Sequence, residues 1–245
     1  VVVQSTETGT VYLVNTTVTV SNLASITGAA GNQWNSVAIS SPSTNTSLSA
    51  TGLADGTYKA YAVDAAGNLS GASNNSVIVD NTPPTVSSVA ITGAEGVQNS
   101  FVNAGDNVSV TATFSEAVIV DNSSGNPTIT LIVGTDNRTA TYASGGDNST
   151  AMVFRYMIQA GDTDSNGISI RADALALNSS TIRDAALNNA ILTHSQWSDN
   201  YAYIVDNTPP TVSSVAITGA TYKQNNFLNA DDVVTVKATF NEAFP

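Results

Sequence analysis

Apolar and polar residues alternate over short stretches of this chain, which is typical of β-strands that bury one face. Turn-forming sequences such as Ser124-Gly125-Asn126 separate these stretches. One segment, residues 172–190, has partly helical spacing that Asn and Ser interrupt, and we expect a long loop with one short turn there. The pattern predicts an all-β fold, with strands at Thr10–Val14, Ser36–Ile39, Thr57–Asp64, Ser76–Val79, Val86–Thr92, Val108–Phe114, Thr128–Val133, Arg138–Tyr142, Ala151–Ile158 and Tyr201–Val205.

A long internal repeat organises the chain. The residues from Asp80 to Ala94, DNTPPTVSSVAITGA, recur unchanged from Asp206 to Ala220, an offset of 126 residues (206 minus 80). The similarity continues from FVNAGDNVSVTATFSEA at Phe101–Ala117 to FLNADDVVTVKATFNEA at Phe227–Ala243. This period is too long for a solenoid and has the size of a β-sandwich domain. We therefore expect tandem immunoglobulin-like β-sandwich domains in a linear array.

The repeat also predicts domain boundaries. We expect a first domain at 1–79 that lacks its first strand or two, a linker at 80–83, a second domain at 84–205, a linker at 206–209, and the first strands of a truncated third domain at 210–245. Each linker runs into two prolines, which hold the chain extended and block sheet pairing across the boundary. The abrupt start at Val1 leads us to expect an excerpt from a longer protein.

Charge and composition exclude several classes of function. The formal net charge is −12, from 19 acidic and 7 basic residues, so the chain has no basic patch to bind nucleic acid. It has no cysteine, which excludes disulfides and thiolate sites, and no apolar run of membrane-spanning length. Most acidic residues are Asp, and many of these lie beside Gly or Asn, a bias that turn chemistry and the coordination of a hard cation explain equally well.

Several motifs resemble those of a known group. FSEAVIV, NPTITLIVG, YMIQAGDTDSNGISI, LNSSTIRDAALNNA and VDNTPP occur in the order typical of bacterial immunoglobulin-like or cadherin-like repeats of large surface adhesins, of the biofilm-associated and RTX types. The first domain, with GLADGTYKAYAVDAAGNLS, is similar to a shorter bacterial immunoglobulin-like type. The resemblance covers nearly the whole chain and implies extracellular spacer or binding modules that calcium often rigidifies. One departure is DAALN at Asp184–Asn188, where the group usually has DAAGN.

Strand direction predicts which acidic residues share one end of the second domain. In a seven-stranded sandwich, the loops after the second and before the seventh strand lie where the chain enters. These loops carry Glu116 and Asp184, and the linker brings Asp80 and the carbonyl of Asn81 to the same end. Carboxylates gathered there repel one another without a cation, and calcium prefers oxygen ligands of this kind. We therefore expect calcium at this joint.

The same reasoning extends the prediction to other acidic residues. Asp206, Asn207 and Glu242 take the corresponding places at the next joint, and Glu7 and Asp64 belong at the outer end of the first domain. The alternative for the linker aspartates is an Asx-turn before proline, with the glutamates as solvated loop residues.

A second candidate calcium site is the loop Asp162-Thr163-Asp164-Ser165-Asn166-Gly167, which superficially matches the start of an EF-hand. Strands rather than helices flank it, so a plain acidic turn is the alternative to a site formed by Asp162, Asp164 and Asn166.

The remaining residues argue against catalysis. His194 is the only histidine, and its polar neighbours predict an exposed loop position without a triad or a zinc site. The sequence therefore predicts a non-catalytic extender segment of a bacterial cell-surface adhesin, stiffened by calcium and contacting neighbouring domains of the same chain. The alternative is a subunit of a surface filament or surface layer, in which copies join head to tail by strand complementation. The adhesive ligand is open.

Overall fold

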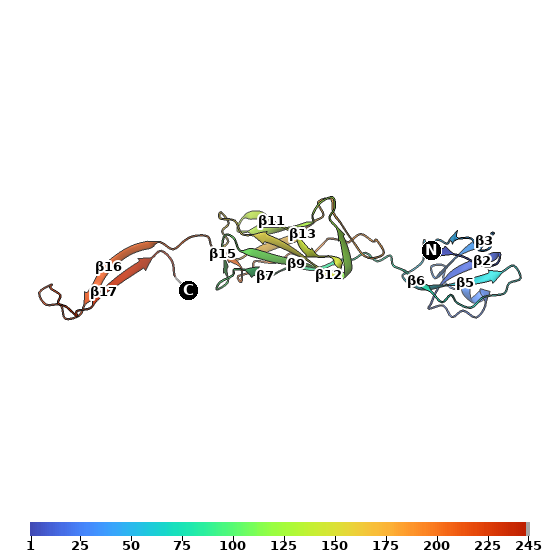
Figure 1. Ribbon diagram of the computed structural model, residues 1–245, viewed down its shortest axis with the longest axis horizontal. Coiled ribbons are helices and arrows are strands. Elements are labelled where there is room, and N and C mark those ends of the chain that lie inside the picture. The colour runs from blue at the N-terminus through green and yellow to red at the C-terminus, as the bar shows by residue number, and fades with distance from the viewer. Residues whose placement is uncertain (244–245) are drawn as a thin grey trace.

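The β-strands gather into separate sheets that follow one another along the chain. The computed structural model describes residues 1–243, so the last two residues of the predicted third domain lie outside the described residues. Figure 1 shows three parts arranged along the long axis of the molecule, which we call the N-terminal unit (1–79), the middle unit (84–205) and the C-terminal hairpin (212–240). The prediction of an all-β fold is confirmed, while the exact domain boundaries stay a prediction.

The N-terminal unit contains a four-stranded antiparallel sheet. Its strand order is β3-β2-β5-β6, and β1 pairs separately with β4. Alternate residues of β2 and β5 face a small core, where Leu13 and Tyr58 are fully buried with Leu48. The strands are β1 (Val2–Val3), β2 (Gly9–Asn15), β3 (Trp34–Ile39), β4 (Thr46–Ser47), β5 (Gly56–Asp64) and β6 (Ser76–Val79).

A short helix in this unit was not predicted. α1 (Leu23–Thr27) begins with a capping box, in which the side chains of Asn22 and Ser25 each accept a hydrogen bond from the other's backbone N–H. Ile26 is its fully buried residue. Five residues are too few to show helical periodicity, so the helix left little signal in the sequence. Within residues 1–243, no helix is long and apolar enough to cross a membrane.

The middle unit is built on one larger sheet. Its strand order is β13-β10-β11-β12-β9-β14, with β7 also paired to β9, while β15 pairs in parallel with β8. Ile91 from β7 and Ile170 from β13 belong to one hydrophobic core, although β13 is at one end of this order and β7 joins it at β9, near the other end, so the sheet curls around the core. The strands are β7 (Val86–Glu95), β8 (Phe101–Val102), β9 (Asn107–Asp121), β10 (Thr128–Val133), β11 (Asp136–Gly145), β12 (Asp147–Met157), β13 (Ser169–Ala176), β14 (Thr181–Arg183) and β15 (Ile204–Val205).

Two expectations about the end of this unit were wrong. Residues 172–190 are not one long loop, because β13 extends to Ala176 and β14 forms at Thr181–Arg183. β14 pairs with the second half of β9, a partner distant in sequence that local spacing cannot reveal. The strand expected at Tyr201–Val205 shortens to Ile204–Val205.

His194 is buried, contrary to the expectation of an exposed loop histidine. Its side chain is only 8% exposed, and its Nε2 accepts a hydrogen bond from the backbone N–H of Ala174 at 2.9 Å. Nδ1 therefore carries the hydrogen and donates to the carbonyl oxygen of Ser195 at 2.8 Å. The ring thus closes a loop against the end of β13, a tertiary contact that its polar sequence neighbours did not indicate.

The first strand of the C-terminal hairpin has the same sequence as Val86–Ala94 of the middle unit but a different environment. It consists of β16 (Val212–Ala220) and β17 (Val234–Phe240), paired antiparallel. Ile217 is 73% exposed, whereas Ile91, its counterpart in the identical segment of β7, is 6% exposed. The local strand pattern therefore survives without the burial that the rest of the middle unit provides.

Two turns with nearly identical sequences adopt the same conformation. In DAAGN (Asp64–Asn68) and DAALN (Asp184–Asn188), the aspartate carboxylate accepts hydrogen bonds from the backbone N–H and from the side-chain amide of the asparagine. The fourth position has a positive φ in both turns, 89° at Gly67 and 73° at Leu187. Glycine tolerates this conformation, whereas the Cβ of a leucine is strained in it.

Replacing Leu187 by glycine should therefore stabilise the middle unit. Leu187→Gly is expected to raise its free energy of unfolding by about 1 kcal/mol, because the left-handed conformation costs a non-glycine residue about that much. Urea unfolding can be followed by Trp197 fluorescence in a Trp34→Phe background, since the chain has two tryptophans. Ala186→Gly is the control and should not stabilise; an equal gain from both variants would contradict this explanation.

Candidate metal centre

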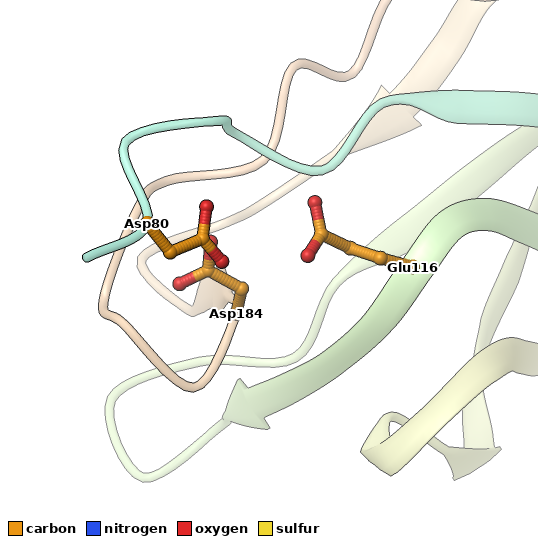
Figure 2. A group of neighbouring side chains, drawn as sticks. All are labelled: Asp80, Glu116 and Asp184. Atoms are coloured by element: carbon orange, nitrogen blue, oxygen red, sulfur yellow. The ribbon is translucent and has the colours of Figure 1, made fainter. Parts of the chain in front are cut away.

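Three carboxylates converge between the N-terminal and middle units. One oxygen atom from each of Asp80, Glu116 and Asp184 lies within 4.8 Å of the other two. Figure 2 shows the three side chains pointing toward one another from three different segments. Among residues 1–243, this is the one group of three or more acidic, histidine or cysteine side chains that is arranged closely enough to share a metal ion.

The linker supplies Asp80. This residue follows β6 directly, and its carboxylate accepts a hydrogen bond from the backbone N–H of Thr82 at 3.0 Å. Pro83 and Pro84 then carry the chain into the middle unit, where the carbonyl of Pro84 accepts a hydrogen bond from the N–H of Ile191. The aspartate is thus held in an Asx-type turn, which was the alternative to a metal ligand. The two roles are compatible because a carboxylate accepts about four hydrogen bonds or ligand bonds.

A bulge in β9 positions Glu116. Residues 107–113 of β9 pair with β12, and pairing resumes at Val118 opposite Ser149, which leaves residues 114–117 facing a single residue of β12. At this place β9 also exchanges β7 for β14 as its neighbour. A bulge bends the strand and redirects its side chains. Glu116 is therefore half-buried within a strand and not in a loop as expected.

The turn after β14 holds Asp184 in place. The carboxylate is 1% exposed, and Asn188 donates to both of its oxygens at 2.8 Å, once from the backbone and once from the side chain. The Asn188 amide also donates to the carbonyl oxygen of Asp80 at 3.1 Å, which ties the turn to the linker. Asn188 was not among the predicted site residues, although its place in the DAALN motif was the signal that could have identified it.

The charges of the three acids act on one another. The pKa of Glu116 is raised, first by its partial burial and then by the negative charges of Asp80 and Asp184. Loss of a proton from Glu116 is thus disfavoured as long as no positive charge is present. A cation between the three carboxylates would reverse this effect.

The donor set fits a hard divalent cation. All three side chains offer carboxylate oxygens, and two oxygens bound to one calcium at about 2.4 Å lie at most about 4.8 Å apart. The observed spacing is within that limit. Calcium would take its remaining ligands from water or from carbonyl groups, to a total of about six to eight.

The side chain of Asn81 points away from this group. Its amide donates to the carboxylate of Asp55 at 2.7 Å and to the carbonyl of Leu53 at 3.1 Å, both in the N-terminal unit. Metal coordination by the carbonyl of Asn81 stays a prediction. Asp55 was not among the predicted residues, and its single position before β5 carried no repeat signal.

At the next joint, Asp206 and Glu242 line one hollow of about 450 Å³ between the middle unit and the hairpin. The carboxylate of Asp206 accepts a hydrogen bond from the N–H of Thr208 at 2.9 Å, as Asp80 does from Thr82. Asn207 instead points into the middle unit and donates to the carbonyl of Asp162. Two of the three predicted residues thus lie near each other.

At the outer end of the N-terminal unit, Glu7 and Asp64 line one hollow of about 240 Å³. The carboxylate of Asp64 is held by Asn68, and the hydrogen bonds from that residue's side chain and backbone lower the pKa of Asp64. No third acid of the described residues joins this pair closely enough to complete a group of three.

The EF-hand-like loop is held together by hydrogen bonds from the protein itself. The buried carboxylate of Asp162 accepts from the Arg138 Nε at 2.6 Å, from the Tyr156 hydroxyl and from the backbone N–H of Gln159. Burial acts to raise the pKa of Asp162, but the hydrogen bonds from these three groups outweigh it and lower the pKa. The guanidinium therefore supplies the positive charge that a cation would bring.

The side chains of Asp164 and Asn166 are likewise hydrogen-bonded to other groups of the protein. The carboxylate of Asp164 accepts from the backbone N–H groups of Gly134, Asn166 and Gly167 at 2.8 to 3.1 Å. The side chain of Asn166 donates to Asp199, outside the loop. The structure therefore favours the alternative reading of this loop as an acidic turn.

Replacing Glu116 by glutamine should relieve the repulsion at the joint. In a chelator at neutral pH, Glu116→Gln is expected to raise the free energy of unfolding by about 1 kcal/mol, the interaction of two unit charges about 4 Å apart in water. The folded-state pKa of Glu116 is raised, so the wild type regains this stability as the pH falls and the glutamate takes up a proton. The gain from the variant should accordingly shrink in acid.

Thermal unfolding of both proteins across the pH range measures this effect. Glu95→Gln is the control, because Glu95 pairs with Arg155 on the surface and away from the joint. A gain that does not change with pH, or that Glu95→Gln shares, would rule out repulsion at the joint as its cause.

Replacing Asp162 by asparagine should destabilise the middle unit without affecting cation binding. Asp162→Asn leaves the Arg138 guanidinium without its buried carboxylate, and we expect a loss of about 3 kcal/mol. The wild-type advantage should fade in acid, since the lowered pKa of Asp162 means that its stabilisation is lost as the pH falls through the folded-state value. Calorimetric titration with calcium supplies the second measurement, and a lost binding site would restore the loop as a metal centre.

Comparisons with known proteins give no match: no family model, no curated protein and no solved structure matches this chain.

Proposed function

We propose that this chain is a non-catalytic extender segment of a bacterial cell-surface adhesin, built from tandem immunoglobulin-like domains whose joints are stiffened by calcium. The observation that carries the proposal is the origin of the three converging carboxylates. Asp80 comes from the linker, whereas Glu116 and Asp184 come from the middle unit. An ion bound to all three cross-links the linker to the unit that follows it.

The energetics favour an ion at this place. Without one, the joint brings together three negative charges, one of them on the buried carboxylate of Asp184. Such an arrangement costs free energy, and a divalent cation turns it into an attraction. Repulsion between the carboxylates therefore loosens the joint without the ion, and the ion fixes it.

The arrangement of the units suits a spacer. The N-terminal unit, the middle unit and the hairpin follow one another along the long axis in Figure 1. Because the linker and part of the β-hairpin sequence repeat after 126 residues (206 minus 80), further copies of the unit would lengthen such an array without new contacts. A bacterial cell-surface location follows from the resemblance of the motifs to adhesin repeats, and calcium at millimolar concentration is available outside cells.

A second candidate, the head-to-tail subunit, is favoured by apolar residues of the C-terminal hairpin and of a hollow in the N-terminal unit. Val215, Ile217 and Val236 of the hairpin are each more than half exposed. The N-terminal unit has a hollow of about 380 Å³ lined in part by Val3, Leu13 and other apolar residues. Strand complementation between copies would cover such surfaces.

Calcium should stabilise and stiffen the protein. At an ion concentration 100-fold above the dissociation constant, binding to the folded state alone contributes about 2.7 kcal/mol, and we expect the melting temperature of the middle unit to rise by several degrees. Small-angle scattering should show a narrower range of molecular dimensions in calcium than in EDTA. Asp80→Asn should lose both effects, whereas Asp136→Asn, at the exposed start of β11 and at the opposite end of the middle unit, should keep them.

Two results of these measurements would count against the proposal. Melting and scattering curves that are the same in calcium and EDTA would remove the mechanism, and equal effects of magnesium would contradict calcium as the ion, because magnesium requires shorter bonds of about 2.0–2.1 Å. The same scattering data give the molecular mass. A mass that grows with protein concentration would favour the head-to-tail subunit, and a stable monomer would exclude it.

A further inference from the structure

The linker Asp80-Asn81-Thr82 faces two ways. The carboxylate of Asp80 lies with Glu116 and Asp184 of the middle unit. The next two residues turn back toward the N-terminal unit and do not take part in that group. One tripeptide therefore contacts both units, with its successive side chains directed to opposite sides.

The two residues that turn back, Asn81 and Thr82, donate hydrogen bonds to a single carboxylate. Asp55, in the turn before β5, accepts hydrogen bonds from the backbone N–H and the side-chain amide of Asn81, both at 2.7 Å. Its other oxygen accepts from the hydroxyl of Thr82. The Asn81 amide reaches the carbonyl of Leu53 as well. Hydrogen bonds to a charged acceptor are stronger than those between neutral groups, and here three of them meet on one side chain.

The second linker repeats the arrangement with different partners. The side chain of Asn207 accepts a hydrogen bond from the N–H of Ala104 at 2.6 Å. Its amide donates to the carbonyls of Gln159 and Asp162 at 3.0 and 2.7 Å. All three partners belong to the middle unit, which precedes this linker as the N-terminal unit precedes the first. The asparagine is thus bonded to the preceding unit in both linkers.

We infer that the linker asparagines are anchors that make an ion at the linker aspartate act on two units instead of one. The inference rests on the proposed function. All three acids of the metal centre lie at or beyond residue 80, so an ion by itself connects only the linker and the middle unit. The bonds of Asn81 to Asp55 and Leu53 pass that restraint to the N-terminal unit.

The contacts on either side of the linker explain why the anchor is needed. Beyond the linker, the N–H of Thr85 donates a hydrogen bond to the hydroxyl of Ser115, and the carbonyl of Pro84 accepts one from the N–H of Ile191. Before the linker, β6 is part of the N-terminal sheet up to Val79. Free rotation between the units is therefore confined to residues 80–83, and the metal centre restrains one side of this segment while Asn81 restrains the other.

Distance measurements between spin labels test the inference on the full chain. The chain has no cysteine, so Asn45→Cys and Ala143→Cys place one label on an exposed position of each unit. In calcium, the unaltered linker should give a narrow distribution of distances between the labels. Asn81→Ala should lose the narrow distribution while its calcium affinity, measured by calorimetry, stays within about threefold, because the amide does not touch the metal centre.

Two further variants complete the experiment. Asp55→Ala removes the partner of Asn81 from the other side and should give the same broad distribution with the same affinity. Asn74→Ala, at an exposed position of the N-terminal unit, is the matched control and should behave as the unaltered linker does. A narrow distribution in calcium for both Asn81→Ala and Asp55→Ala would overturn the inference.

The failure of the proposed function has a different signature. In that case the unaltered linker binds no calcium and has the same distribution in calcium and EDTA. The anchor is then judged without the ion: broader distributions for Asn81→Ala and Asp55→Ala than for Asn74→Ala in EDTA support it, and identical distributions overturn it.

Discussion

Repulsion between three carboxylates is the interaction around which the joint of this protein is organised. Asp80, Glu116 and Asp184 lie within 4.8 Å of one another, and the pKa of Glu116 is raised as a result of burial and of its two neighbours. The protein keeps this unfavourable arrangement through a β-bulge at Glu116 and a hydrogen-bonded turn at Asp184. A fixed cluster of charge on a joint makes the geometry of that joint sensitive to cations.

Each residue of the linker motif makes a different contact. The aspartate faces the following unit, the asparagine is bonded to the preceding unit, and the backbone N–H of the threonine holds the aspartate carboxylate. Because the two prolines after the threonine stiffen the chain and cannot donate backbone hydrogen bonds, little freedom remains between these contacts. The conservation of the motif between the two linkers of one chain is explained if the same geometry is needed twice.

The two acidic candidates differ in what neutralises them. Asp162 and Asp164 had the more familiar metal-loop spacing, yet Arg138, Tyr156 and backbone N–H groups satisfy their oxygens. Spacing along the chain cannot reveal this, because Arg138 lies on another strand. Asp80 and Asp184, 104 residues apart (184 minus 80), could be identified as neighbours because strand direction places their segments at one end of the unit.

The sequence by itself determined the all-β class, the repeat, the linker motif and the acids that gather at the first joint. These follow from local alternation and from strand direction, which depend on few residues at a time. Only the tertiary structure decided the partners of Asp55, the buried position of His194, and the contrast between Ile91, 6% exposed, and Ile217, 73% exposed in the same local sequence. The physical reason is that burial and hydrogen-bond satisfaction are set by strands distant in sequence. Ile91 shares a core with residues of β12 and β13, whereas Ile217 lies in a sheet that has two strands among residues 1–243.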